Sequence, residues 1–128
     1  MPLRSLLVDD NDAFLEAASV LLEGEGVTVA GVASDIAEAL RQARALRLDV
    51  ILVDIGLGDE SGFDLAWLLA EDRQGSQRVQ RGRAEVILIS SYAETDYAEL
   101  IAASPAAGFL AKSKLSAEAI GRILRRTP

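Results

Sequence analysis

The chain has 128 residues and a formal net charge of −7, and half of its residues are hydrophobic. This length and composition predict a single domain with an ample core. The absence of cysteine and histidine excludes disulfides, thiolate or histidine metal sites, and a Ser-His-Asp triad. The negative charge argues against direct binding of nucleic acid. No apolar run approaches the roughly 20 residues that span a bilayer, and no signal-peptide pattern is present, so we expect no membrane contact and a cytoplasmic location.

The first half of the chain predicts two strand–helix units. Apolar residues at 6–8 form the first strand, and Gly24 and Gly26 end the helix that follows. Residues 27–32 form the second strand, and Ser34 or Asp35 caps the next helix. The residues that we expect to face the core are Phe14, Ala17, Ala18, Leu21 and Leu22 in the first helix, and Ile36, Ala39, Leu40, Ala43 and Leu46 in the second.

The second half adds three further units. A strand at 49–54 precedes a helix that begins at Gly62. A strand ending at Ser90 precedes a helix that contains Tyr97, Leu100 and Ile101 and is stopped by Pro105, and a strand with Phe109 precedes a helix capped by Ser116. This order predicts an α/β domain over residues 1–128, a doubly wound (βα)5 sandwich with helices on both faces of a five-stranded parallel sheet. The arginine-rich segment 71–85 is interpreted as a solvated helix extension and loop, with a partner surface as the alternative.

Four of the predicted strands end in polar side chains. The first is followed by Asp9 and Asp10, the third ends at Asp54, the fourth at Ser90, and the fifth is followed by Lys112. Because the carboxyl ends of parallel strands meet at one edge of a sheet, we expect these groups to share a site. Two carboxylates 4 Å apart repel by roughly 4 kcal/mol at an effective dielectric near 20, and a hard cation such as Mg²⁺ relieves that repulsion.

This combination of groups favours phosphoryl transfer. Carboxylates, Mg²⁺, an ammonium and a hydroxyl supply the positioning and charge stabilisation on which that reaction depends. Asp54 ends the most central strand and is the best candidate for a nucleophile that forms an acyl phosphate. Each residue alone has a simpler explanation, because acidic residues after strands commonly cap the next helix, and the acidic segment 9–12 could do only that. The prediction depends on the joint arrangement.

With these spacings the chain resembles the receiver domains of two-component response regulators, the CheY-like superfamily, over essentially its whole length. Asp54 follows Asp10 by 44 positions, Lys112 follows Ser90 by 22, and Gly62 lies eight residues beyond Asp54. The resemblance implies a flavodoxin-like sheet of strand order 2-1-3-4-5. It also implies that Asp54 is phosphorylated with the help of Ser90 and Lys112, and that Mg²⁺ is held by Asp9, Asp10, Asp54 and the backbone carbonyl of Gly56.

The resemblance implies a role in signalling. A sensor histidine kinase or a phosphotransfer protein would donate the phosphoryl group, and the domain would be a phospho-acceptor that also dephosphorylates itself, not an enzyme with a separate substrate. Ser90 and Phe109 would form a switch that reshapes the face of the fourth helix, fifth strand and fifth helix, through which a homodimer could form. Phe109 has a simpler interpretation as a core aromatic residue.

Two positions depart from many relatives. Gly58 and Ser113 stand where proline is frequent, so we expect no cis peptide after Lys112. Ser113 makes the chain similar to receivers of the NarL/LuxR type, which implies a helix-turn-helix output domain outside this chain. A dinucleotide-binding interpretation of the glycines at 56, 58 and 62 fails because their spacing is wrong by one. The serious alternative is a receiver-like interaction module that phosphorylation does not switch.

Overall fold

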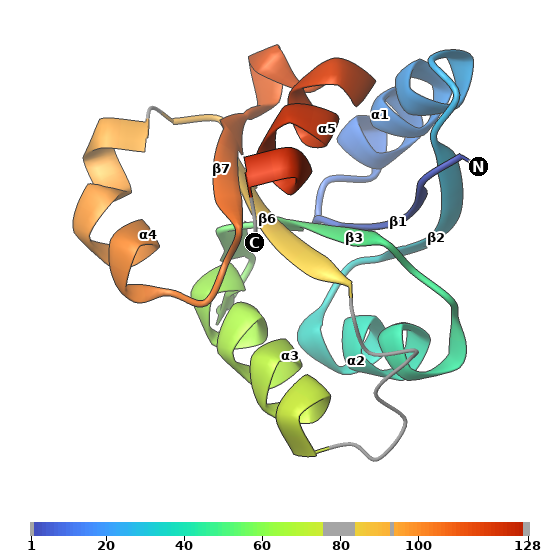
Figure 1. Cartoon of the computed structure of the whole chain (residues 1–128). Helices are drawn as coiled ribbons and strands as arrows, with labels where there is room; N and C mark the ends of the chain where they lie inside the picture. Colours follow the sequence, from blue (N-terminus) through green and yellow to red (C-terminus); the bar gives the residue numbers. More distant parts are fainter. Residues whose placement is uncertain (1, 76–83, 93, 127–128) are drawn as a thin grey trace.

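The computed structural model describes residues 2–75, 84–92 and 94–126. It contains all five predicted strand–helix units (Figure 1). In chain order the elements are β1 (Arg4–Val8), α1 (Asp12–Gly24), β2 (Thr28–Ala33), α2 (Ile36–Ala45), β3 (Val50–Asp54), β4 (Gly56–Leu57), β5 (Glu60–Ser61), α3 (Gly62–Gly75), β6 (Glu85–Ser90), the 3-10 helix η1 (Glu94–Tyr97), α4 (Ala98–Ala103), β7 (Gly108–Ala111), the 3-10 helix η2 (Lys112–Lys114) and α5 (Ala117–Arg126).

The main sheet is parallel and has the strand order β2-β1-β3-β6-β7. Since β6 and β7 are its fourth and fifth strands along the chain, the predicted order 2-1-3-4-5 is confirmed. β3 lies at the centre and all five of its residues are buried, as expected for a strand covered on both faces. The prediction that Asp54 ends the most central strand is therefore correct.

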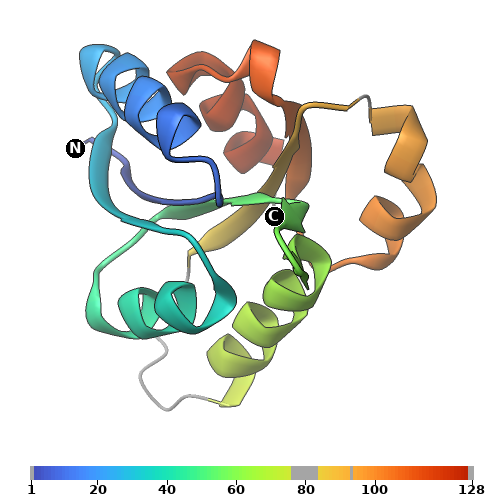
Figure 2. The same ribbon diagram turned by 180° about the vertical axis from the view of Figure 1, so that it is seen from behind.

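Helices cover the two faces of the sheet in separate layers. α1 and α5 lie on one face and α2 and α3 on the other, and the reverse view shows the same arrangement (Figures 1 and 2). Successive side chains of β3 alternate between the layers: Val50 and Leu52 pack with α1 and α5, whereas Ile51 and Val53 pack with α2 and α3. Both faces are thus apolar, and polar groups gather where the strands end.

The apolar faces of the helices agree with the sequence pattern, with one correction in α1. All five predicted core residues of α2 pack into the core. In α1 the buried residues are Leu15, Ala18 and Leu22, whereas Ala17 is exposed and Leu21 is 42% exposed. Two apolar stripes overlap on this helix, and packing against the sheet and α5 selects the stripe that contains Leu15.

The fourth helix is shorter and less covered than its pattern suggested. None of the six residues of α4 is buried, and Leu100 is 55% exposed. Ile101 and Tyr97 contribute the partly buried contacts of this region with the core. The helix ends at Ala103, before Pro105, as predicted.

The arginine-rich segment coincides with the end of α3. The helix continues to Gly75, which agrees with the expected helix extension, whereas residues 76–83 lie outside the described part of the chain.

None of the helices described here has both the length and the apolar character needed to cross a bilayer. The described backbone has no cis peptide bond, so the expectation for the Lys112–Ser113 bond is confirmed.

Candidate functional site

The predicted acidic residues meet at the carboxyl edge of the sheet. Asp9 and Asp10 directly follow β1, and Asp54 is the last residue of the neighbouring strand β3. One carboxylate oxygen from each of the three residues lies within 4.8 Å of the others. Asp9 is completely buried, Asp54 is 9% exposed and Asp10 is exposed. The strand ends therefore bring together the three carboxylates that the sequence singled out.

Lys112 reaches this cluster from the end of β7. Its Nζ atom lies 2.6 Å from Oδ2 of Asp9 and 3.7 Å from Oδ2 of Asp54. The other oxygen of Asp9, Oδ1, accepts the backbone N–H of Asn11 at 2.9 Å. Among the described residues, the buried Oδ2 of Asp9 has no partner apart from this ion pair. The ammonium is thus what offsets the burial of the Asp9 charge.

Burial and the charges of the cluster make the ionised form of Asp54 less favourable than that of a free carboxyl. Burial, followed by the negative charge of Asp9, raises the pKa of the Asp54 carboxyl from 3.8 to about 6. The Lys112 ammonium and a hydrogen bond from the backbone of Gly56 act in the opposite direction, and Asp10 adds a smaller upward contribution. One ammonium is therefore insufficient to neutralise the three carboxylates at this edge.

The donor set fits a hard divalent cation. Three converging carboxylates supply oxygen ligands of the kind that Mg²⁺ prefers, and the exposed side of Asp10 leaves room for the waters that Mg²⁺ retains. Burial is the largest cause of the raised pKa of Asp54, and the charges of Asp9 and Asp10 raise it further. The same local excess of negative charge favours a bound cation. Asp9, Asp10 and Asp54 are thus the described residues that could hold such an ion.

Ser90 ends β6, the strand beside β3, and its side chain is buried at the same edge. Its Oγ atom accepts the backbone N–H of Tyr92 at 3.0 Å. Phe109 lies within β7, three residues before Lys112, and packs partly buried against the core on the side of α3, as Tyr97 does. Ser90 therefore belongs to the polar edge, whereas Phe109 lies in the hydrophobic layer toward η1 and α4.

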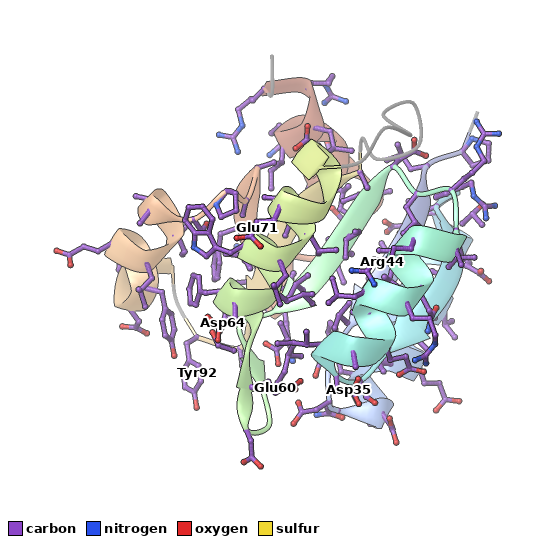
Figure 3. All side chains as sticks on the ribbon, turned by 90° about the horizontal axis from the view of Figure 1, so that it is seen from below. Asp35, Arg44, Glu60, Asp64, Glu71 and Tyr92 are labelled. Carbon is purple, nitrogen blue, oxygen red and sulfur yellow. The ribbon has the colours of Figure 1, made fainter. Side chains whose placement is uncertain are left out.

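The loop after Asp54 contains a small hairpin that the sequence did not predict. β4 and β5 pair antiparallel around Gly58, whose φ is +65°. Proline fixes φ near −65° and could not adopt this turn, which explains the departure from relatives with proline here. Glu60 of this hairpin accepts the backbone N–H of Ile36 at 2.9 Å, at the N-terminal end of α2 where Asp35 forms the cap (Figure 3). The loop is thereby attached to α2.

Gly62 is required by a close approach of two backbone segments. Its N–H donates to the carbonyl of Ile55 at 2.9 Å. A Cβ atom at position 62 would lie 2.1 Å from the backbone carbonyl oxygen of Asp54 and 2.8 Å from the Cα of Ile55. Any side chain here must displace the backbone that carries Asp54, so the glycine supports the position of the site.

The start of α1 shows whether Asp9 and Asp10 cap this helix or belong to the acidic cluster. The side chain of Asn11 accepts the N–H of Phe14 at 3.1 Å and forms the N-cap of this helix. Neither Asp9 nor Asp10 serves as that cap, so the simpler capping interpretation does not account for them.

Phe14 contacts the lysine of the site. Its helical spacing predicted only a core position, but the centroid of its ring lies 4.3 Å from Nζ of Lys112.

Comparison with known proteins agrees with this geometry. The sequence profile of the response regulator receiver domain matches residues 6–124. The chain belongs to this family. The signal receiver domain of the response regulator NarL from Mycobacterium tuberculosis is 28% identical, with a TM-score of 0.76 over 98% of this chain and 95% of that one. The predicted resemblance to CheY-like and NarL-type receivers is therefore confirmed, and the family places the domain in two-component signalling through aspartate phosphorylation.

Two further relatives carry this domain within longer proteins. The DNA-binding response regulator MtrA from Mycobacterium tuberculosis is 38% identical over 69 residues, which are 54% of this chain and 30% of MtrA. A response regulator from Burkholderia pseudomallei, solved with a phosphorylated aspartic acid, a calcium ion and citrate, is 29% identical and has a TM-score of 0.72 over 94% of this receiver domain and 65% of that chain. The matched 69 residues thus span less than a third of the length of MtrA.

Proposed function

We propose that Asp54 is the residue of this receiver domain that accepts the phosphoryl group. The observation that carries the proposal is the difference between the three carboxylates. Asp9 is fully buried and contacts Lys112 at 2.6 Å, which leaves no path for an incoming phosphorus atom. Asp54 keeps some exposure, and Nζ of Lys112 at 3.7 Å is near enough to contact a phosphoryl oxygen attached to it. Asp10 is exposed and, in this proposal, serves the metal alone.

The other residues of the cluster have supporting roles in the proposal. Mg²⁺, when bound, would neutralise charge on the phosphoryl oxygens, and its ligands would be the three aspartates and the carbonyl of Gly56. An oxygen of the Asp54 carboxylate attacks phosphorus while the bond from phosphorus to the imidazole nitrogen of the donor breaks. Lys112 and the hydroxyl of Ser90 donate to the phosphoryl oxygens. Hydrolysis of the acyl phosphate at the same site would restore the carboxylate.

In this proposal, phosphorylation of Asp54 changes the shape of one surface of the domain. Once its hydroxyl donates to the phosphoryl group, Ser90 moves toward Asp54, and Phe109 turns inward behind it. This changes the face formed by α4, β7 and α5, and the sparse burial of α4 agrees with a segment that can shift. A homodimer through this face stays a prediction.

The partners follow from two-component signalling. We infer that the phosphoryl donor is a sensor histidine kinase or a phosphotransfer protein, and that residues 1–128 act as one receiver domain that holds Mg²⁺ and is not an enzyme with its own substrate. The relative MtrA is described as DNA-binding, which supports the prediction of a helix-turn-helix output domain joined to this receiver. The acidic balance of the chain, −7, supports the view that the receiver itself does not contact DNA.

Intact mass spectrometry tests the proposal directly. The chain is incubated with Mg²⁺ and acetyl phosphate, and we expect one phosphoryl adduct on the wild type and none on Asp54→Ala. Asp59→Ala is the matched control, because Asp59 is an exposed aspartate in the same loop, and it should retain the adduct. An undiminished adduct on Asp54→Ala would contradict the assignment of the residue. A wild type that takes no phosphoryl group would instead favour the interaction module that phosphorylation does not switch.

A further inference from the structure

The ammonium of Lys112 has an aromatic neighbour in addition to its two carboxylates. Its Nζ atom lies 4.3 Å from the centroid of the Phe14 ring, and the Lys112 side chain is only 15% exposed. A cation over a ring face at this distance is attracted by the quadrupole of the ring, more strongly when it is desolvated. We propose that Phe14 is a positioning residue that holds the Lys112 ammonium at the phosphoryl-transfer site.

Phe14 and Asp9 contact this ammonium from one connected turn. Oδ1 of Asp9 accepts the N–H of Asn11 at 2.9 Å, and the side chain of Asn11 accepts the N–H of Phe14 at 3.1 Å. Oδ2 of Asp9 and the Phe14 ring then meet the same Nζ atom. These four interactions link Asp9 to Asn11, Asn11 to Phe14, and both Phe14 and Asp9 to Lys112. The N-cap of α1 therefore also fixes where the Phe14 ring lies relative to the lysine.

Of the two residues that hold the Lys112 ammonium, Asp9 is also a candidate metal ligand and Phe14 is not. Asp9 belongs to the cluster that fits a divalent cation, so its contact with Lys112 depends on whether that site is filled. The face of a phenyl ring does not coordinate Mg²⁺, so the contact with Phe14 is independent of the metal. The ring also accepts no conventional hydrogen bond and carries no charge. It can therefore hold the lysine while leaving its N–H groups and its full positive charge for phosphoryl oxygens.

The contact itself is measurable by NMR without any reaction. The chain contains two lysines, Lys112 and Lys114, and Lys114 is exposed, so it serves as an internal reference. We expect the ε-CH₂ protons of Lys112 to resonate upfield of those of Lys114 because of the ring current, with and without Mg²⁺. The difference should vanish in Phe14→Leu and persist in Phe14→Tyr. Coincident lysine signals in the wild type would overturn the proposal.

The consequence for phosphorylation is measurable as a rate. With acetyl phosphate and Mg²⁺ in excess, we expect Phe14→Leu to slow adduct formation about fivefold, the factor that a cation–π contact of this class supplies. Phe14→Tyr restores the ring and should react at nearly the wild-type rate. Phe63→Leu is the matched control, because Phe63 is also partly buried but packs against Tyr97. Leucine fills most of the volume of phenylalanine. If Phe14 only filled space, Phe14→Leu would therefore react as fast as Phe63→Leu. Equal rates for these two variants would overturn the proposal.

This inference depends on the proposed function, and the two can fail separately. If the wild type took no phosphoryl group, the proposed reaction would be wrong, while the lysine spectrum would still decide whether the ring holds the ammonium. If the wild type reacted and Phe14→Leu reacted equally fast with its ring-current difference lost, the assignment of Asp54 would stand and the positioning role of Phe14 would fall.

Discussion

Replacing Asp54 by asparagine should stabilise the metal-free domain at neutral pH. Asp54 is 9% exposed, and burial together with the charge of Asp9 raises the pKa of its carboxyl from 3.8 to about 6. A shift of this size corresponds to about 3 kcal/mol of folding free energy lost when the group is charged. Asparagine has the same shape and can still accept the hydrogen bond from the backbone of Gly56, but it carries no charge to bury.

The sign and the pH window follow from the two pKa values. Below about pH 4 the carboxyl is protonated in both the folded and unfolded states, so it contributes no penalty. As the pH rises, the unfolded chain loses this proton first, and the penalty on the folded state grows until the folded-state pKa near 6 is passed. The stabilisation by Asp54→Asn should therefore be greatest above this pKa, and it should decrease by about 2 kcal/mol between about pH 8 and about pH 4.5.

Urea unfolding in EDTA at these two pH values measures the effect. Asp59→Asn is the control, because it makes the same change at an exposed position of the adjacent loop, and it should stay within about 0.5 kcal/mol of the wild type. If Asp54→Asn were no more stable than the wild type at the higher pH, or if its advantage were the same at both pH values, the electrostatic description of the cluster would be wrong.

Three further outcomes are expected. Asp10→Ala should weaken Mg²⁺ binding in calorimetry by about tenfold or more, and far more than Asp59→Ala does, because it removes one of the converging carboxylates; equal losses would mean that the metal site is misplaced. Gly62→Ala should lower the free energy of unfolding by about 3 kcal/mol, since its Cβ would meet the backbone of Asp54. Gly24→Ala, where a Cβ meets nothing within 4 Å, should be nearly neutral, and similar losses for both would contradict the close-approach argument. Chelation of Mg²⁺ should abolish the phosphoryl adduct, and an adduct of wild-type extent in EDTA would show that the metal is dispensable.

The central part of the fold and of the site was predictable from local sequence patterns. A strand buried on both faces must be apolar until it leaves the core, so the polar residues after the strands mark the edge where they end. Parallel pairing then brings Asp9, Asp10 and Asp54 together. Lys112 joins them because the fifth strand ends at the same edge of the sheet.

The remaining features depend on contacts between distant segments. The inward stripe of α1 includes Leu15 because of packing against the sheet and α5, which helical spacing alone does not reveal. The hairpin after Asp54 has strands of two residues, too short for an alternating pattern, and its attachment through Glu60 joins residues far apart in the chain. The ring of Phe14 over Lys112 likewise connects the two ends of the sequence.

Locating the phosphoryl group on the chain tests the central claim most directly. After reaction with acetyl phosphate and Mg²⁺, borohydride reduces an aspartyl phosphate to homoserine, which peptide mass spectrometry can place. Trypsin would release Asp54 in the peptide 48–73 and the pair Asp9 and Asp10 in the peptide 5–41, so the candidate sites separate cleanly. Homoserine at position 54 alone is the predicted result. Homoserine at position 9 or 10, or none in a protein that carries the adduct, would contradict the assignment of Asp54 as the phospho-acceptor.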